Sequence, residues 1–243
     1  IVLGEDMKSR IAAKGVSPDR IDIVRDGVET PMSTDSASDS TSTSTSTSTF
    51  DADVIRAIRA DFRFVLLHAG NLGFYGAWET LIAAAHELQN DGVGLIFVGD
   101  GAQRSRLQEL AANAPNVRFL PFFPSTKISS VLAAADAHVI TIKRGLEGVV
   151  VPSKMYGILA AGRPIIAIAP KETDAAALGT RENFGCSADP DVPEEVVAIV
   201  RSLLNDPTRL ASMGAAARSA APRYTRAAEI QKFAAILESA AQR

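Results

Sequence analysis

Short apolar runs recur between residues 63 and 169, and longer amphipathic segments separate them. Brief runs that are apolar on both faces predict strands buried in a parallel sheet, while apolar residues three to four positions apart predict helices. The alternation of the two predicts a doubly wound parallel α/β domain of the Rossmann-like type. The predicted strands cover 63–69, 94–99, 116–122, 137–143 and 164–169. The predicted helices between them cover 77–89, 103–113, 127–135 and 152–162.

The two ends of the chain have different patterns. Residues 4–14 carry acids first and bases last before Gly15, which predicts a short helix, and 21–24 is a candidate strand. The C-terminal part predicts additional helices only. They cover 193–206, 207–221 and 225–241.

Residues 31–50 are almost entirely Ser, Thr, Asp and Ala, and this segment cannot bury enough apolar surface to offset the entropy of ordering it. We therefore predict a flexible loop; the Ser-Thr alternation leaves an edge strand as the alternative. The predicted organisation follows from these patterns. It has an entry segment over 1–30, this loop, the Rossmann-like domain over 51–222 and a final helix over 223–243.

Composition excludes several classes of protein. A net charge of −3 without a basic stripe argues against a nucleic-acid partner, and the single cysteine, Cys186, excludes an internal disulfide. No run approaches the roughly 20 apolar residues of a membrane span, so any membrane association is expected to be peripheral. We expect a cytoplasmic location, at the inner face of the membrane if the protein is membrane-associated at all. Because the chain begins at Ile1, we interpret it as a fragment.

Ligands of open parallel sheets bind beyond the carboxyl ends of the strands. The first such loop, HAGNLGFYGAW, has Gly70, Gly73 and Gly76, which allow close approach of backbone amides to an anion. Its spacing is neither the dinucleotide fingerprint nor a Walker motif, and a simple tight turn is the alternative. Phe122, after the third strand, is a candidate for stacking on a base, or else rim packing.

A second candidate loop follows the strand at 137–143. Lys143 and Arg144 are cations that suit a diphosphate, and Glu147 suits a sugar hydroxyl. A helix is predicted to begin near Pro152, and Ser153 and Lys154 add a hydroxyl and a cation to its first turn. A cation there opposes the helix dipole, which indicates that an anion binds nearby. Three scattered histidines, His68, His86 and His138, are interpreted as core or surface residues.

The combination AGNLG, VGDGAQRSRLQELA, NVRFLPFFP, LAAADAHVITIK and EGVVVPSKMYGILAAGRPIIA resembles the donor-binding C-terminal half of family 4 retaining glycosyltransferases of GT-B fold. The resemblance is strongest to bacterial transferases of surface-polysaccharide assembly. It implies transfer of a sugar, with retention, from a nucleotide diphosphate sugar to a hydroxyl of a glycan or lipid-linked acceptor. It implies no cofactor and no metal. It also implies that an N-terminal domain with the acceptor site is absent from this chain, that the final helix packs toward that domain, and that the fragment alone is inactive.

Carried over by position, the resemblance implies that Gly70, Asn71 and Gly73 line the diphosphate, with Ser153 at the helix start. Glu147 and Lys154 become the candidate catalytic residues. Gly148, Val149 and Val150 would lie near the phosphates or the sugar, and Phe122, Lys143 and Arg144 complete the predicted nucleotide-sugar site.

The sequence departs from the family pattern in two places. Gly157 stands where a second glutamate usually holds the ribose, and Phe74 and Tyr75 stand where a basic residue often follows the first loop. Two alternatives therefore stay open. One is a non-catalytic nucleotide-sugar-binding domain, and the other is a nucleotide-sugar epimerase of the same architecture.

Overall fold

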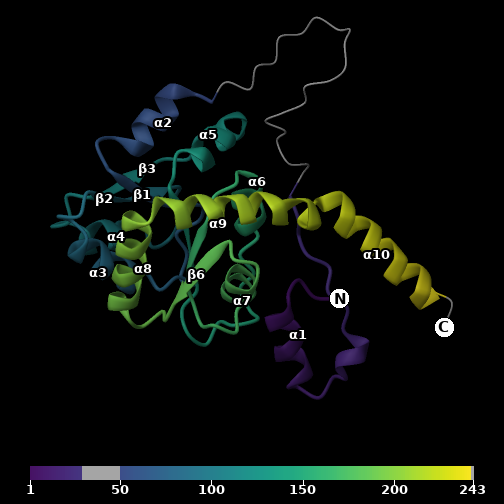
Figure 1. The fold of residues 1–243 in the computed structure, drawn as a ribbon. Coiled ribbons are helices and arrows are strands. Elements are labelled where there is room, and N and C mark those ends of the chain that lie inside the picture. The colour runs from purple at the N-terminus through teal and green to yellow at the C-terminus, as the bar shows by residue number, and fades with distance from the viewer. Residues whose placement is uncertain (29–49, 242–243) are drawn as a thin grey trace, which may run out of the picture.

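The computed structural model describes residues 1–28 and 50–241, so the loop predicted over 31–50 lies, up to its last residue, outside the described part of the chain. Within it, six parallel strands form one sheet in the order β3-β2-β1-β4-β5-β6 (Figure 1). The strands are β1 Phe64–Ala69, β2 Val93–Val98, β3 Val117–Leu120, β4 Ala137–Thr141, β5 Ile165–Ile168 and β6 Gly185–Ala188. The predicted α/β class is confirmed.

Helices cover both faces of the sheet because alternate strand residues point to opposite sides. Phe64 and Leu66 pack with α3, α4 and α8, whereas Val65 and Leu67 pack with α2 and α5. On that second face, β4 and β5 pack with α6, α7 and α9. These helices are α2 Ala52–Arg59, α3 Trp78–Glu87, α4 Arg104–Leu110, α5 Ile128–Ala133, α6 Lys154–Ala160, α7 Asp174–Arg181, α8 Pro193–Asn205 and α9 Pro207–Ala220.

Three elements of the sheet domain were not predicted. The strand β6 reads GCSA and lies at the sheet edge, so it lacks the apolar run that marks the other strands. In α2 the apolar signal is confined to one narrow stripe, in which Val54 and Ile58 are buried. The alanine-rich α7 buries small side chains, which give a weak periodic pattern. Each of these elements forms through contacts with other elements of the fold, and a single sequence does not show those contacts.

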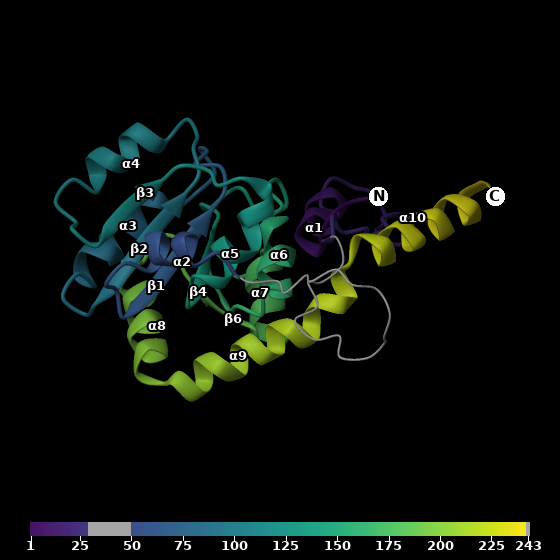
Figure 2. The ribbon, with the colours of Figure 1, turned by 90° about the horizontal axis from the view of Figure 1, so that it is seen from above.

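The N-terminal segment contains α1 (Glu5–Ala12), which confirms the predicted helix, and η1 (Pro18–Arg20). The strand predicted over 21–24 was wrong, because Ile23 forms only an isolated bridge with Val2. After η3 (Ala221–Tyr224), α10 (Arg226–Ala241) runs outward beside the N-terminal segment, as Figures 1 and 2 both show. The amide of Arg25 donates to Oε2 of Glu229 at 2.7 Å, which ties these two ends together.

No helix within residues 1–28 and 50–241 is both long and apolar enough to cross a bilayer.

The strand order reverses between β1 and β4, because β2 and β3 follow on one side and β5 and β6 on the other. Loops that leave such neighbouring strands diverge to opposite faces, and the crevice between them is where open α/β sheets bind ligands. The loops after β1 and β4 therefore define the region where a site is expected.

Candidate functional site

The loops that follow β1 and β4 are fastened to each other by backbone groups. The amide of Lys143 donates to the carbonyl of Tyr75 at 2.8 Å, and the amide of Ala77 donates to Oγ1 of Thr141 at 2.8 Å. Gly70 opens the first of these loops with φ +143°, and the position of a Cβ on it faces open space. The crevice at the strand reversal thus has a fixed shape and a bare backbone at its floor.

A polar cavity of about 290 Å³ lies over this floor. Its walls come from the ends of β1 and β4, the loops after them and the start of α6. The lining residues are Ala69, Gly70, Asn71, Tyr75, Thr141, Ile142, Val150, Val151, Pro152, Ser153 and Lys154. Apolar surface makes up most of its lining, but Asn71, Thr141, Ser153 and Lys154 make it the more polar of two adjoining cavities, so we call it the polar cavity; these groups suit an anionic ligand.

An apolar cavity of about 220 Å³ adjoins the first one. It shares Ala69, Gly70 and Lys154 with the polar cavity and otherwise has hydrocarbon walls. The remaining lining residues are Val98, Phe122, Phe123, Ile128, Val131, Leu132 and Gly157. A polar and an apolar compartment that meet at one lysine suit a ligand with a charged centre and a flat, less polar end.

Lys154 lies at the wall between the two cavities. Its Nζ lies 2.9 Å from Nδ1 and 3.2 Å from Nε2 of His68, whose side chain is fully buried at the end of β1. Burial lowers the pKa of the lysine from 10.5 to about 7. Burial and the lysine charge also hold the pKa of His68 well below 6.5, so the ring is neutral and can accept a hydrogen bond from the ammonium.

Two of the predicted residues have other partners. Arg144 forms ion pairs with Asp189 and Asp191, both at 2.7 Å, which direct its guanidinium to the ends of β5 and β6. Gly73 is buried, and its carbonyl accepts a hydrogen bond from the indole of Trp78 at 2.7 Å. Neither residue lines the two joined cavities, and neither does the exposed Lys143.

The loop around Glu147 is bound by α1. The Glu147 carbonyl accepts a hydrogen bond from Arg10 at 3.1 Å, and its carboxylate accepts from the amide of Gly145 at 3.0 Å. The amide of Gly148 is turned toward Oδ2 of Asp6 at 3.3 Å. Of this predicted loop, Val150 lines the polar cavity, while Val149 is half exposed outside it.

The helix predicted to begin at Pro152 begins instead at Lys154, with Ser153 as its N-cap residue, and ends at Ala160. With seven residues it is too short to bring a strong dipole to the crevice. The cation of Lys154 therefore remains as the electropositive feature of the site, since the amide of Gly70 donates to the carbonyl of Val98 at 2.9 Å.

Gly157, where the family pattern has a glutamate, lines the apolar cavity one turn after Lys154. A Cβ on it would meet only Leu132 Cδ1, at an ordinary 3.6 Å. The position therefore has room for a side chain.

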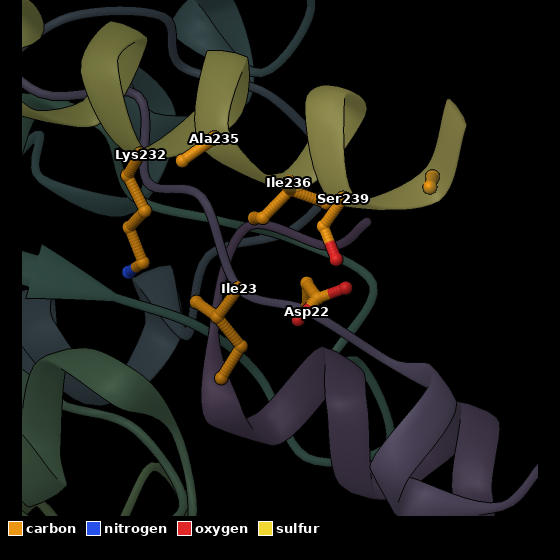
Figure 3. A pocket seen from close by; sticks show the side chains of 7 residues that line it. Asp22, Ile23, Lys232, Ala235, Ile236 and Ser239 are labelled. Atoms are coloured by element: carbon orange, nitrogen blue, oxygen red, sulfur yellow. The ribbon is translucent and has the colours of Figure 1, made fainter. Parts of the chain in front are cut away.

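A further hollow of about 350 Å³ lies between α10 and residues 22–23, far from the strand ends (Figure 3). Lys232, Ala235, Ile236 and Ser239 descend from α10 toward Asp22 and Ile23 on the opposite wall. It lacks the glycine floor of the crevice. The joined cavities at Gly70 and Lys154 are the better candidate site.

Sequence reasoning interpreted His68 as a core or surface residue and missed its contact with Lys154; the structure buries it completely. The available signal was its position: it stands two residues before Gly70, at the carboxyl end of a strand. A histidine there faces either the core or the crevice. Only the packing of α6 against β1 decided between them.

Comparison with known protein families identifies a family that matches the sheet domain. The sequence profile of Glycos_transf_1, glycosyl transferases group 1, matches residues 55–220, well over half of the chain. The chain belongs to the group 1 glycosyl transferases. This family match confirms the predicted resemblance to glycosyltransferases, and it spans the sheet domain from α2 to the end of α9.

Two curated relatives of this chain are bacterial. WbjE of Pseudomonas aeruginosa, described as a probable glycosyltransferase, is 27% identical over 169 residues, which are 68% of this chain and 42% of WbjE. WcaI of Escherichia coli (strain K12), described as a putative colanic acid biosynthesis glycosyl transferase, is 29% identical over 147 residues, or 59% of this chain and 36% of WcaI. The matched region therefore spans less than half of either relative.

Solved structures of similar fold include Anabaena Alr3699/HepE in complex with UDP, with a TM-score of 0.75 and 19% identity over 98% of this chain and 63% of that one. A glycosyltransferase from Rickettsia africae ESF-5 gives a TM-score of 0.76 with 12% identity, over 98% and 62% of the two chains. At these identities the likeness shows the fold, and it confirms the Rossmann-like GT-B architecture of this glycosyl transferase.

Proposed function

We propose that this glycosyl transferase moves a sugar from a nucleoside diphosphate sugar to an acceptor hydroxyl in the synthesis of a bacterial surface polysaccharide. One observation carries the proposal: an apolar and a polar cavity meet at Gly70 and Lys154. The nucleoside would occupy the apolar side, with Phe122 on its wall, and the sugar the polar side. The diphosphate would then lie at the junction, beside the ammonium. Family membership favours transfer over an epimerase or a non-catalytic binding domain.

The chemical role of Lys154 follows from the reaction. Departure of the nucleoside diphosphate concentrates negative charge on the leaving phosphate, and a preorganised cation lowers the energy of that transition state. Lys154 would supply this charge in place of a divalent metal. The amide of Asn71 and the hydroxyl of Ser153 would bind the other phosphate oxygens, and Glu147 would bind a sugar hydroxyl. Addition of EDTA should then leave transfer unchanged, whereas metal dependence would argue against this arrangement.

UDP is the first donor nucleotide to test, because a protein of similar fold has been crystallised with it. Calorimetric titration of UDP into the 243-residue chain and into Lys154→Met should give binding that weakens by about 10- to 100-fold in the variant, the cost of removing one paired charge. The matched control is Lys143→Met, an exposed lysine outside both cavities. Equal UDP affinity of all three proteins would remove the proposed phosphate role of Lys154.

The proposal also covers the stereochemical course of the transfer and the location of the acceptor site. We expect retention of the anomeric configuration, which NMR of the first product formed would test. The curated relatives are more than twice as long as the regions matched here, and the resemblance assigns the acceptor to another domain. The 243-residue chain alone is therefore expected to bind donor without transferring the sugar, and efficient transfer by it would contradict this division.

We expect the reaction to occur at the cytoplasmic side of the membrane, where nucleotide sugars are available, with at most peripheral attachment to the inner face. The acceptor would be a glycan or a lipid-linked glycan. Fractionation of cells that express the complete protein would test the location: extraction from membranes by high salt supports peripheral attachment, and a requirement for detergent opposes it.

A further inference from the structure

The ammonium of Lys154 is held by a partner that carries no charge. Partly buried lysines usually pair with a carboxylate, because an unpaired charge is costly away from water. Among residues 1–28 and 50–241, however, the hydrogen-bonding partner of this ammonium is the ring of His68, which as a neutral imidazole accepts at one of its two nitrogens. The charge therefore remains uncompensated at the wall shared by the two cavities.

The surroundings of His68 keep it neutral. Its ring lies edge-on to Trp78, with centroids 4.8 Å apart, and near Phe97 at 6.1 Å. The other ionisable groups that face this region are His138 on β4, whose pKa burial lowers to about 4, and Tyr75 at the rim of the polar cavity. Both are uncharged at neutral pH, so no nearby group in the described part of the chain offsets the lysine charge.

We propose that His68 is a positioning residue for donor binding: its neutral imidazole fixes the ammonium of Lys154 at the junction of the cavities without neutralising it. The inference rests on the proposed function and deepens it. A carboxylate at the same place would orient the lysine equally well but would compete with the diphosphate for its charge. A neutral acceptor supplies the orientation and leaves one full positive charge for the ligand.

Proton uptake follows from this arrangement. The unliganded lysine titrates near neutral pH because it is desolvated and has no anionic partner. A diphosphate beside it favours the charged form and raises its pKa. At pH 8, above this pKa, the lysine of the free protein is mostly neutral, so UDP binding should take up a large part of one proton, and affinity should fall as the pH rises further.

Substitution of His68 by three residues tests the positioning role. Gln keeps a neutral acceptor, Glu has the same shape with a negative charge, and Leu removes the acceptor. Calorimetry at pH 7.5 should find UDP affinity within about threefold of wild type for His68→Gln, and about tenfold or more weaker for His68→Glu and His68→Leu. Circular dichroism and thermal unfolding identify any variant that does not fold. The Gln and Glu pair still decides the question if the Leu variant fails, and equal affinity of these two would overturn the inference.

A double-mutant cycle separates this inference from the proposed function. If His68 acts through Lys154, then His68→Leu should not weaken UDP binding further in the Lys154→Met background. Loss of affinity in Lys154→Met together with wild-type affinity in His68→Leu would refute the positioning role alone. Wild-type affinity in Lys154→Met would refute the phosphate role of the lysine, and with it both proposals.

The proton count is the readout that a merely structural role would not change. Titrations at pH 8 in buffers of different ionisation enthalpy measure the protons taken up on UDP binding, and at this pH the phosphates of free UDP are already ionised. Uptake should be present in wild type and in His68→Gln, and absent in Lys154→Met. Absence of uptake in the wild-type protein would contradict the uncompensated ammonium on which the inference depends.

Discussion

The amide of Gly148, in the loop after β4, donates a hydrogen bond to Oδ2 of Asp6, in the first turn of α1, at 3.3 Å. Burial and the nearby Asp174 raise the pKa of the Asp6 carboxyl, while the amides that it accepts from lower it. The N-terminal segment thus holds the loop that flanks the polar cavity, across 142 residues of sequence.

Gly148→Ala should destabilise this junction. Gly148 has φ +66°, and a Cβ there would lie 2.5 Å from the carbonyl oxygen of Asp6. Backbone strain and the clash together should lower the free energy of unfolding by about 2–3 kcal/mol, measured by urea denaturation. Gly145→Ala, at φ +89° with open space around the Cβ, is the control for strain without a clash. Equal losses in the two variants would show that the contact with α1 contributes nothing.

Gly70→Ala should weaken UDP binding more than it alters stability. A Cβ on Gly70 meets no protein atom within 4 Å but would project where the two cavities meet. We expect about a tenfold loss of UDP affinity, since the added methyl group blocks close approach of the diphosphate to the backbone. Gly145→Ala again carries the strain of a positive φ, outside both cavities, and its affinity should stay at the wild-type value. A Gly70→Ala variant that binds UDP normally would oppose the location of the diphosphate.

The pH dependence of stability should reveal the desolvated Lys154. Its pKa in the folded protein, about 7, lies below the value of 10.5 that it has when exposed. The unfolded chain therefore binds more protons between these values, and this lysine makes stability rise with pH across that window. Lys154→Met lacks this rise, so between pH 6.5 and pH 9.5 its free energy of unfolding should fall behind that of wild type by on the order of 2 kcal/mol. The expected difference is smaller than the full pKa shift would give, because the lysine opens toward the cavities.

Urea denaturation of wild type, Lys154→Met and the exposed control Lys143→Met at the two pH values gives this difference. The control should follow the wild-type dependence. A Lys154→Met variant that also follows it would show that the ammonium is well solvated, and would remove the basis for proton uptake on donor binding.

Two substitutions at Gly157 should separate helix stability from recognition. Gly157→Ala should stabilise α6 by about 0.5–1 kcal/mol, because alanine restricts the unfolded chain and its Cβ has room beside Leu132. Gly157→Glu should in addition raise affinity for UDP by about threefold if a carboxylate one turn after Lys154 reaches the ribose hydroxyls. Urea denaturation measures the stability of the two variants, and calorimetric titration measures their affinity for UDP. Stronger binding by the Ala variant alone would point to a more rigid helix.

Much of the fold could be predicted from the sequence because its strands are buried on both faces. The runs at 63–69 and 94–99 contain the uninterrupted apolar stretches 64–67 and 95–98, and they lie within a residue of β1 and β2. The edge strand β6 has no such run, and it is held in the sheet by pairing with β5 and by contact with α7. The strand predicted over 21–24 failed for the same reason: a β-rich tetrapeptide forms a ladder only if a neighbouring strand is available.

Some features of the candidate site could likewise be predicted from the sequence, and others could not. Sequence alone brought Gly70, Ser153 and Lys154 into one hypothesis, because strand ends in a parallel sheet must share one edge and glycine and lysine have recognisable chemistry there. Tertiary structure alone decided that Arg144 pairs with Asp189 and that His68 meets Lys154. Local sequence determines which residues lie at the strand ends. The partner of each side chain depends on how helices far apart in the chain pack across the sheet, and that packing fixes burial and charge together.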